Sequence, residues 1–162
     1  MLGSKTLKAV LLVAALPAMT IGITGSATAD ASVTWRNGAA NGSQEQGRYL
    51  YGQAGGGDVG LYDGGGWRDV LNTDGSWNEI DTFGRCLTGY GQHAYTENCN
   101  SGKDATNWYE RWREIPANGG GWKLQNVMSG YFLDWAGDQN NTGPGSVYVN
   151  PTDWNNQNQR WY

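Results

Sequence analysis

WRDVLNTDGSW (residues 67–77) and WREIPANGGGW (residues 112–122) are the stretches of this chain that decide its fold. Each places one Trp ten residues after another, and each opens with Trp, Arg, an acid and a β-branched residue. A third Trp-centred ending, QRWY (residues 159–162), closes the chain. Recurrence at a period of about 40 to 50 residues indicates an architecture of repeated units. We therefore predict three repeats, at about 33–70, 71–115 and 116–162.

Each repeat also carries Gly-x-x-Leu in a strand-like segment. Side chains alternate along a strand, so the Leu residues would face one side and the residues before them the other. Four strands per repeat give about twelve in all, a spacing typical of a sandwich or barrel. Three equivalent units close around a threefold axis and remove exposed edges, whereas an open solenoid would need distinct capping repeats. Strands are predicted at 47–51, 84–88 and 130–134, at 59–62, 94–99 and 147–152, and at 66–70, 111–115 and 159–162.

The composition favours an all-β chain with an aromatic core. Nine Trp and nine Tyr stand against two Phe, Gly clusters punctuate the chain, and sustained helical periodicity is absent. The Trp residues that recur at the ends and beginnings of the repeats are predicted to be structural: Trp67, Trp112, Trp161, Trp35, Trp77 and Trp122. Trp108, Trp135 and Trp154 break the pattern, so they either cover loops or offer ring surfaces to a ligand.

Residues 1–29 have the pattern of a secretory signal. Lys5 and Lys8 precede an apolar run, and Ala27-Thr28-Ala29 forms a cleavage site before Asp30. An uncleaved membrane anchor is the alternative, but the apolar run is short and broken by Pro17. We predict a secreted, extracellular protein, without membrane insertion, whose residues 30–162 form one domain.

Charge and cysteine content narrow the function further. After removal of the signal segment with Lys5 and Lys8, the chain has nine Lys and Arg (11 less these two) and 15 Asp and Glu. Its net charge is therefore −6 with His neutral. An acidic chain without a basic cluster argues against nucleic acid and anionic membranes. Cys86 and Cys99 are expected to pair in a secreted protein. A metal pair is the alternative, but with His93 alone it has too few ligands for a closed zinc site; no metal or cofactor is predicted.

Taken together, Gly-x-x-Leu and a Gln-x-Trp ending in three registered copies resemble the ricin-type β-trefoil lectin domain over nearly all of residues 33–162. The third repeat matches best, with Leu133-Asp134 and Gln159-x-Trp161. The second keeps the family's Cys pair but ends in Glu110-x-Trp112, and the first has Gly65-x-Trp67. The resemblance implies a β-trefoil of three four-stranded repeats around a pseudo-threefold axis, and a carbohydrate-binding function.

In that family the ligand-binding Asp follows the Leu of the second strand, which points to Asp134 alone. A carboxylate can accept from two neighbouring sugar hydroxyls, which Tyr51 and Thr88 at the matching positions cannot do. Aligning 94–99 with 147–152 turns Val147 and Val149 inward and Tyr148 and Asn150 outward beside Asp134. Asn158 matches the family's turn amide, and Gln159 is expected to brace the turn. The family stacks an aromatic ring where this chain has Asn150, so the ring would come from Tyr148, Trp135 or Trp154.

Plain structural roles remain the alternative for these residues, as a strand residue or cap for Asp134 and as turn chemistry for the Asn residues. No nucleophile elbow, metal-protease or phosphate-loop motif is present, so no catalytic activity is predicted. The leading hypothesis is a non-catalytic protein that binds glycans or polysaccharide. The second is an interaction subunit that directs a secreted toxin or hydrolase, and a trefoil protease inhibitor and an enzyme are weaker alternatives.

Overall fold

Short β-strands make up nearly all of the regular structure in the computed structural model, which describes residues 31–39, 49–137 and 143–162. The predicted signal segment lies outside these residues. None of the described segments is a helix long and apolar enough to cross a membrane. The strands are β1 (Ala31–Val33), β2 (Tyr49–Tyr51), β3 (Gly57–Asp58), β4 (Gly60–Tyr62), β5 (Trp67–Leu71), β6 (Trp77–Asp81), β7 (Arg85–Tyr90), β8 (His93–Asn98), β9 (Arg111–Pro116), β10 (Trp122–Asn126), β11 (Phe132–Trp135) and β12 (Val147–Asn150), joined by the 3₁₀ helices η1 (Trp108–Glu110) and η2 (Gln157–Gln159).

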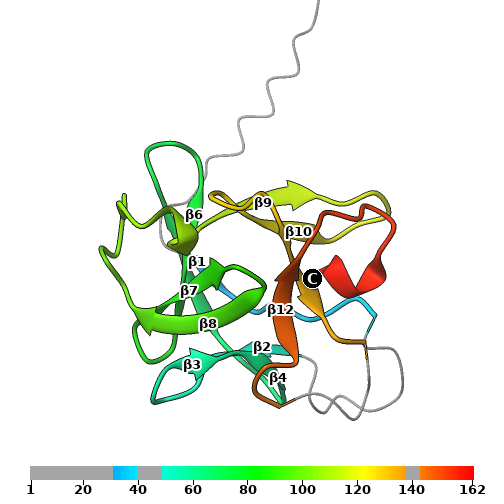
Figure 1. Cartoon of the computed structure of the whole chain (residues 1–162), viewed down its shortest axis with the longest axis horizontal. Coiled ribbons are helices and arrows are strands. Elements are labelled where there is room, and N and C mark those ends of the chain that lie inside the picture. The colour runs from blue at the N-terminus through cyan, green and yellow to red at the C-terminus, as the bar shows by residue number, and fades with distance from the viewer. Residues whose placement is uncertain (1–30, 40–48, 138–142) are drawn as a thin grey trace, which may run out of the picture.

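The strands form one large antiparallel sheet that closes on itself. Hydrogen bonding runs in the order β1-β5-β6-β7-β8-β12-β11-β10-β9, and a further pairing of β9 with β6 closes the strands from β6 to β9 into a ring. A separate small sheet contains β2 and β4. Figure 1 shows these strands wound around a common centre, with η2 in red lying beside the C-terminus. The all-β, barrel-like prediction is confirmed.

Tryptophan and aliphatic side chains fill the centre of this barrel. The period-two alternation of the strands sends Leu50, Leu87 and Leu133 into the core, where all three are fully buried. Val147 and Val149 join them, so the register predicted for the last long strand is confirmed. Five Trp belong to the same cluster: Trp35, Trp67, Trp112, Trp135 and Trp161.

One contact recurs in each of the three predicted repeats. The indole N–H of Trp67 donates to the carbonyl oxygen of Leu50 at 2.9 Å, that of Trp112 to Leu87 at 2.8 Å, and that of Trp161 to Leu133 at 3.1 Å. Each buried indole thereby satisfies its only donor. The Gly-x-x-Leu segment and the Trp ending of each predicted repeat are therefore bonded to each other.

Two sequence expectations about the ends of the repeats differ from the structure. Trp77 is half-buried and Trp122 is 38% exposed, because each opens a strand directly after an exposed, Gly-containing turn. The predicted strand 159–162 is replaced by the end of η2 and isolated bridges from Trp161 to Asn37 and Trp122. Asn156 favours this turn by capping η2, because its side chain accepts a hydrogen bond from the backbone of Asn158.

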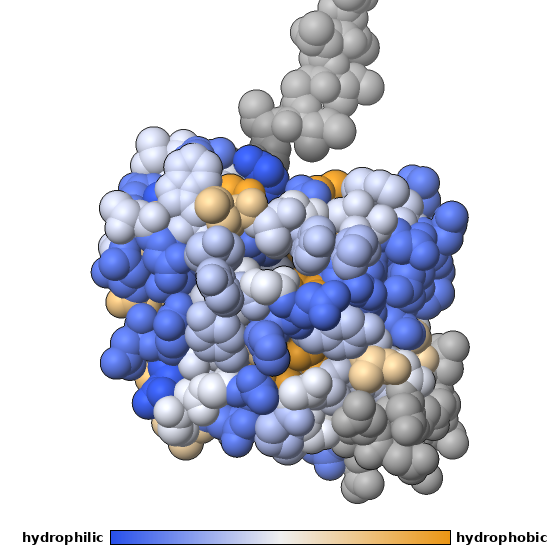
Figure 2. Space-filling model, in the orientation of Figure 1, coloured by the Kyte–Doolittle hydropathy of each residue, from blue (hydrophilic) through white to orange (hydrophobic). Residues whose placement is uncertain are grey.

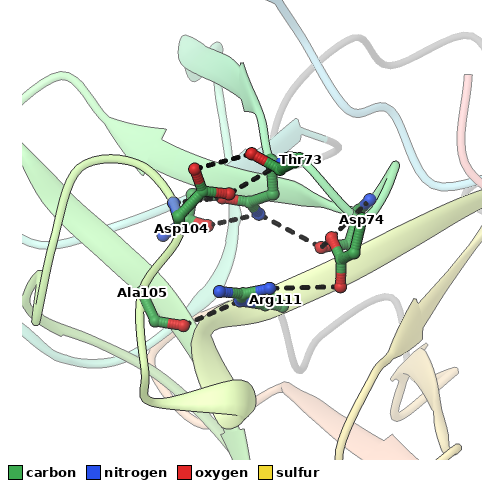
Figure 3. A network of polar contacts seen from close by, with 8 residues as sticks. Thr73, Asp74, Asp104, Ala105 and Arg111 are labelled. Carbon is green, nitrogen blue, oxygen red and sulfur yellow. Dashed lines mark hydrogen bonds and ion pairs between the residues drawn. The ribbon is translucent and has the colours of Figure 1, made fainter.

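Cross-links outside the barrel hold the loop that follows β8. Cys86 and Cys99 form the predicted disulfide, with an S–S distance of 2.07 Å. Figure 3 shows Arg111 in an ion pair of 3.1 Å with Asp74 while its Nε donates to the carbonyl of Ala105. Beside it, the carboxylate of Asp104 accepts from the backbone and hydroxyl of Thr73. The loop is therefore fastened to the turn between β5 and β6.

Polar and near-neutral residues dominate the face seen in Figure 2, where orange apolar atoms form only small separate patches. The large apolar side chains that the described surface does expose are aromatic rings and one Met. They are Phe83, Tyr90, Trp108, Trp122, Met128, Trp154 and Tyr162. Any ligand recognised by stacking must therefore use one of a small set of rings.

Candidate functional site

Asp134 lies on the outer face of β11, as the Leu-Asp pattern requires. Because side chains alternate, Leu133 and Trp135 enter the core while Phe132 and Asp134 face away from it. In the pairing with β12, Asp134 lies opposite Tyr148, and Phe132 lies opposite Asn150. The strand pair thus brings an acid, a phenol and an amide to one surface.

Three amide groups converge on one oxygen of Asp134. Its Oδ2 accepts from the side chains of Gln159 at 2.9 Å, Asn150 at 3.1 Å and Asn156 at 3.3 Å. Gln159 is fully buried and also uses its remaining hydrogen-bonding groups, donating to the carbonyl of Pro151 and accepting from the backbone of Asp153. The carboxylate therefore joins β11, β12 and η2 into one rigid unit.

Burial distinguishes Asp134 from the exposed sugar-binding acid that the sequence analysis expected. The residue is 1% exposed, and its second oxygen, Oδ1, is shielded from solvent without a hydrogen-bond partner. The amides of Asn150, Asn156 and Gln159 pull the carboxylate inward by satisfying Oδ2, which explains the burial. A buried acceptor without a donor is uncommon in folded proteins. Oδ1 is therefore the one unsatisfied position in an otherwise bonded network.

An exposed ring stands beside this network. Trp154 is 52% exposed, and its ring packs edge-on against Phe132 with centroids 5.1 Å apart. Lys123, fully buried, donates from Nζ to the carbonyls of Asp153 and Asn156 and lies 5.7 Å from the centre of the Phe132 ring. Burial lowers the pKa of Lys123. The turn that presents Trp154 is thus held from below by a lysine that satisfies its carbonyl groups.

Tyr148 and Asn150 complete the outer surface, and both are half-buried. Burial raises the pKa of the Tyr148 hydroxyl, and the nearby charge of Asp134 raises it further. Tyr148 therefore keeps its proton and offers a hydrogen-bond donor as well as a ring face. Its neighbour Asn150 is oriented by the bond to Asp134. The surface combines donors, acceptors and apolar ring area.

Two of the residues predicted for this site lie elsewhere. Trp135 is 2% exposed in the core, because it shares the inward face of β11 with Leu133, and its ring cannot stack on a ligand. Asn158 is half-buried, and its backbone carbonyl accepts from Asn37. Its side chain lies close to Gly137, where a Cβ atom would come within 2.7 Å of Nδ2. We find no bond between Asn158 and Asp134 among the described contacts.

Asn156, not Asn158, is the turn amide that reaches Asp134, and the sequence analysis missed it. A signal for it exists, since NWYERW (107–112) and NQNQRW (156–161) both begin with Asn. Asn107 caps η1 just as Asn156 caps η2. Lys123 was also missed, because nothing in the sequence around it distinguishes a buried lysine from a surface one.

The second predicted repeat has a similar turn, in which acidic side chains replace two of the amides. Glu110, in the place of Gln159, accepts from the backbone of Asn100 and the side chain of Asn107. Thr88 replaces Asp134 and donates to Glu97, the residue that aligns with Asn150. Burial raises the pKa of Glu110, and the charge of Glu97 adds to this effect. This turn therefore presents two acids where the third repeat presents the amides of Asn150 and Gln159.

The first predicted repeat has no side chain equivalent to that of Gln159. Gly65 occupies the place of Gln159, and a Cβ atom there would lie 2.2 Å from the carbonyl oxygen of Leu50. Tyr51 occupies the place of Asp134 and packs against Tyr62, with ring centroids 4.9 Å apart. Backbone crowding therefore excludes a Gln side chain from this turn.

A second surface, which we call the tyrosine groove, lies between β7, η1 and the turn after β10. It is an open depression of about 570 Å³ whose walls include exposed Tyr90 and Met128. Tyr90 and Tyr109 meet edge to face at 4.9 Å. The remaining lining residues carry no charge: Gly91, Gln92, Ser129 and Tyr131. The groove suits a neutral, partly apolar ligand or protein segment.

No family model and no curated protein matches this chain. Solved structures do. The Haemophilus ducreyi cytolethal distending toxin is 15% identical, with a TM-score of 0.56 over 70% of this chain and 79% of that one. An endo-β-galactosidase from Clostridium perfringens that releases GlcNAcα1-4Gal is 16% identical, with a TM-score of 0.58 over 81% of this chain and 31% of the enzyme. A designed threefold-symmetric protein, ThreeFoil, is 18% identical, with a TM-score of 0.56 over 80% of this chain and 95% of the design.

At such identities the likeness concerns the fold alone. The match covers less than a third of the endo-β-galactosidase. The match to nearly the full length of a threefold-symmetric design supports the trefoil predicted from the repeats. The chain therefore shares an all-β fold with parts of toxins and of a glycosidase, in agreement with the ricin-type fold that its sequence resembles.

Proposed function

We propose that this chain is a secreted, non-catalytic carbohydrate-binding protein, built as three four-stranded repeats around a pseudo-threefold axis, with one glycan site in the third repeat. The fold shared with domains of toxins and a glycosidase supports a carbohydrate-binding or toxin-associated role. The groups around Asp134 are mainly amides, which transfer no protons near neutral pH. They favour binding over acid–base catalysis.

The observation that carries the proposal is the pairing of an organised polar network with an exposed ring. Sugars offer hydroxyls to polar groups and C–H faces to aromatic rings. Asn150, oriented by Asp134, and Tyr148 would bond hydroxyls, while Trp154 would take a ring face. Asp134 itself would act through its orienting bonds, and Oδ1 would accept from a sugar hydroxyl only after a neighbouring side chain shifts.

A single shallow site of this kind should bind weakly. A dissociation constant near 1 mM corresponds to about 4 kcal/mol of binding free energy. Attachment to a cell surface would then need several copies displayed together, because one site offers no avidity within a chain. Binding should therefore be measured on densely coated glycan surfaces as well as in solution.

The test is a glycan array with matched tryptophan variants. Trp154→Ala removes the proposed stacking ring, and Trp108→Ala removes an equally exposed Trp (51% against 52%) from the turn of the second repeat. We expect Trp154→Ala to lose at least ten-fold in affinity for the glycan that the wild type selects, and Trp108→Ala to keep it. Absence of any glycan binding by the folded wild type would refute the carbohydrate function, and equal losses in both variants would refute the site.

The second candidate function is a targeting subunit of a secreted toxin or hydrolase. The tyrosine groove favours it, because Tyr90 is 58% and Met128 55% exposed and both line one neutral depression. Affinity capture from culture supernatant with wild type and with Tyr90→Ser/Met128→Ser would test it. A partner captured by both proteins equally would argue against the groove, and a wild type that remains a lone monomer would argue against the function.

A further inference from the structure

Three acidic side chains meet on the barrel, away from the turns discussed so far. Asp69 on β5 and Glu79 on β6 lie opposite each other in the hairpin, and Glu114 comes from β9, which also pairs with β6. One carboxylate oxygen from each lies within 4.8 Å of the others. Asp69 is 4% exposed, Glu79 is fully buried, and Glu114 is half-buried. Carboxylates from three different strands therefore share one small, largely dry space.

Each of the three acids has a buried oxygen that no donor satisfies. These atoms are Oδ1 of Asp69 and Oε1 of Glu79 and Glu114. The other oxygen of Glu79 accepts from the indole N–H of Trp35 at 2.9 Å, which fixes the orientation of this carboxylate. Ionised carboxylates are acceptors only and cannot satisfy one another. The cluster therefore needs positive charge from elsewhere, either protons or a cation.

The closeness of the three acids also affects their pKa values. Burial raises the pKa of Glu79 well above its ordinary value, and the charges of Asp69 and Glu114 raise it further. Burial, followed by the charge of Asp69, raises the pKa of Glu114 to about 7. Burial also raises the pKa of Asp69. No Lys or Arg of the described residues lowers these values, so basic side chains in this part of the chain do not neutralise the cluster.

We propose that Asp69, Glu79 and Glu114 form a binding site for a hard divalent cation, with Ca²⁺ as the best fit. The candidate ligands are oxygens without any His or Cys, which disfavours zinc and copper. The ligand oxygens lie within 4.8 Å of one another, close enough for one cation to contact all three, and Ca²⁺ accepts an irregular set of oxygens whereas Mg²⁺ demands a near-ideal octahedron. Half-buried Glu114 provides the side from which an ion would enter.

The sequence contains a trace of this site, although no metal was expected from it. Asp69 and Glu114 occupy the same place, two residues after the Trp that opens each of the two deciding stretches. The third acid, Glu79, sits two residues after the Trp that closes the first stretch. The β5–β6 pairing joins Asp69 to Glu79, but only the folded barrel brings Glu114 to them.

The experiment uses the folded wild type at pH 7 and Ca²⁺ alone as ligand, with Tb³⁺ as a luminescent substitute. Excitation of tryptophan should sensitise Tb³⁺ emission, because the Trp35 indole is bonded to one of the ligands, and Ca²⁺ should abolish this emission in competition. Ca²⁺ at 10 mM should also raise Tm relative to EDTA. Glu114→Gln, chosen because Glu114 is the least buried of the three, should weaken Ca²⁺ binding at least ten-fold.

Glu97→Gln is the matched control, because it removes the same charge from another half-buried carboxyl group. It should leave the affinity for Ca²⁺ and the Tb³⁺ signal unchanged. The proposal is overturned if Ca²⁺ changes neither Tm nor Tb³⁺ emission in the wild type. It is also overturned if Glu114→Gln in EDTA gains stability at pH 7 while Ca²⁺ affinity is unaltered, because the acids would then share protons only.

Discussion

Removing the carboxylate of Asp134 should loosen the third repeat and weaken glycan binding together. In Asp134→Ala, the amides of Asn150, Asn156 and Gln159 lose their common acceptor. Asn150 and Asn156 are half-buried and can turn toward water, but Gln159 is fully buried, and its amide N–H₂ keeps only the bond to Pro151. One unsatisfied buried donor costs about 1–3 kcal/mol.

The loss is partly offset, because the mutation also removes the unpartnered Oδ1 of Asp134. We therefore expect Asp134→Ala to lower the free energy of unfolding by about 2 kcal/mol. For a domain of this size, Tm should fall by roughly 8 °C. Asp134→Asn keeps the size and one acceptor oxygen, so it should cost about 1 kcal/mol.

Urea denaturation followed by tryptophan fluorescence measures the stability change, with the slope compared between variants to detect altered compactness. Binding to the best array glycan should fall about ten-fold in Asp134→Ala, since Asn150 is no longer oriented. Thr88→Ala, at the aligned position of the second repeat, should leave binding unchanged. A stability loss below about 0.5 kcal/mol in Asp134→Ala would refute the described network, because surface substitutions produce changes of that size.

Three further outcomes follow from the fold. Replacing Cys86 and Cys99 by Ala should lower the free energy of unfolding by about 3 kcal/mol, because their disulfide closes a short loop of the unfolded chain. Reduction of the disulfide in the wild type should cause the same loss in denaturation experiments. An unchanged free energy of unfolding would show that the disulfide does not stabilise the fold. Trp112→Phe should lower the free energy of unfolding by about 2 kcal/mol, because the Leu87 carbonyl loses its donor. Trp122→Phe, on the surface, should lower it by less than about 0.5 kcal/mol. Equal losses of stability in urea titrations would contradict the assignment of Trp112 to the core. Burial raises the pKa of Glu110 above the value of 4.5 that it has in the unfolded chain, so the folded protein holds this proton more tightly. The free energy of unfolding should therefore fall as pH rises above 4.5. Glu110→Gln should reduce the fall in Tm between pH 4.5 and 7, and an unchanged pH profile of Tm would contradict this role of Glu110.

Much of the architecture could be predicted because the strands are short and strictly alternating. Leu87 and Leu133 mark the inward face of their strands, and aligning two strands placed Tyr148 and Asn150 beside Asp134. Alternation also explains an error. Trp135 follows Asp134 and must therefore point the other way, into the core, which the period of two already implied.

Burial of polar groups was harder to predict, because it depends on partners distant in sequence. Asp134 is withdrawn from the surface by amides 16 to 25 residues away, from Asn150 to Gln159. Lys123 is buried because carbonyl groups some 30 residues later in the chain accept hydrogen bonds from its ammonium group. The acids Asp69, Glu79 and Glu114 come from three different strands and meet only in the folded barrel. Such groups follow from the tertiary structure and leave little local pattern.

The most direct measurement of the central claim is NMR of the indole and side-chain amide N–H signals during titration with the glycan selected on the array. The chain has nine Trp, and the Trp154→Ala and Trp108→Ala variants assign the two most exposed indoles by the loss of their signals. We predict that the Trp154 indole and the Asn150 amide shift with the added glycan while Trp108 stays in place. Shifts confined to Trp108 or to the residues of the tyrosine groove would contradict a glycan site on the third repeat.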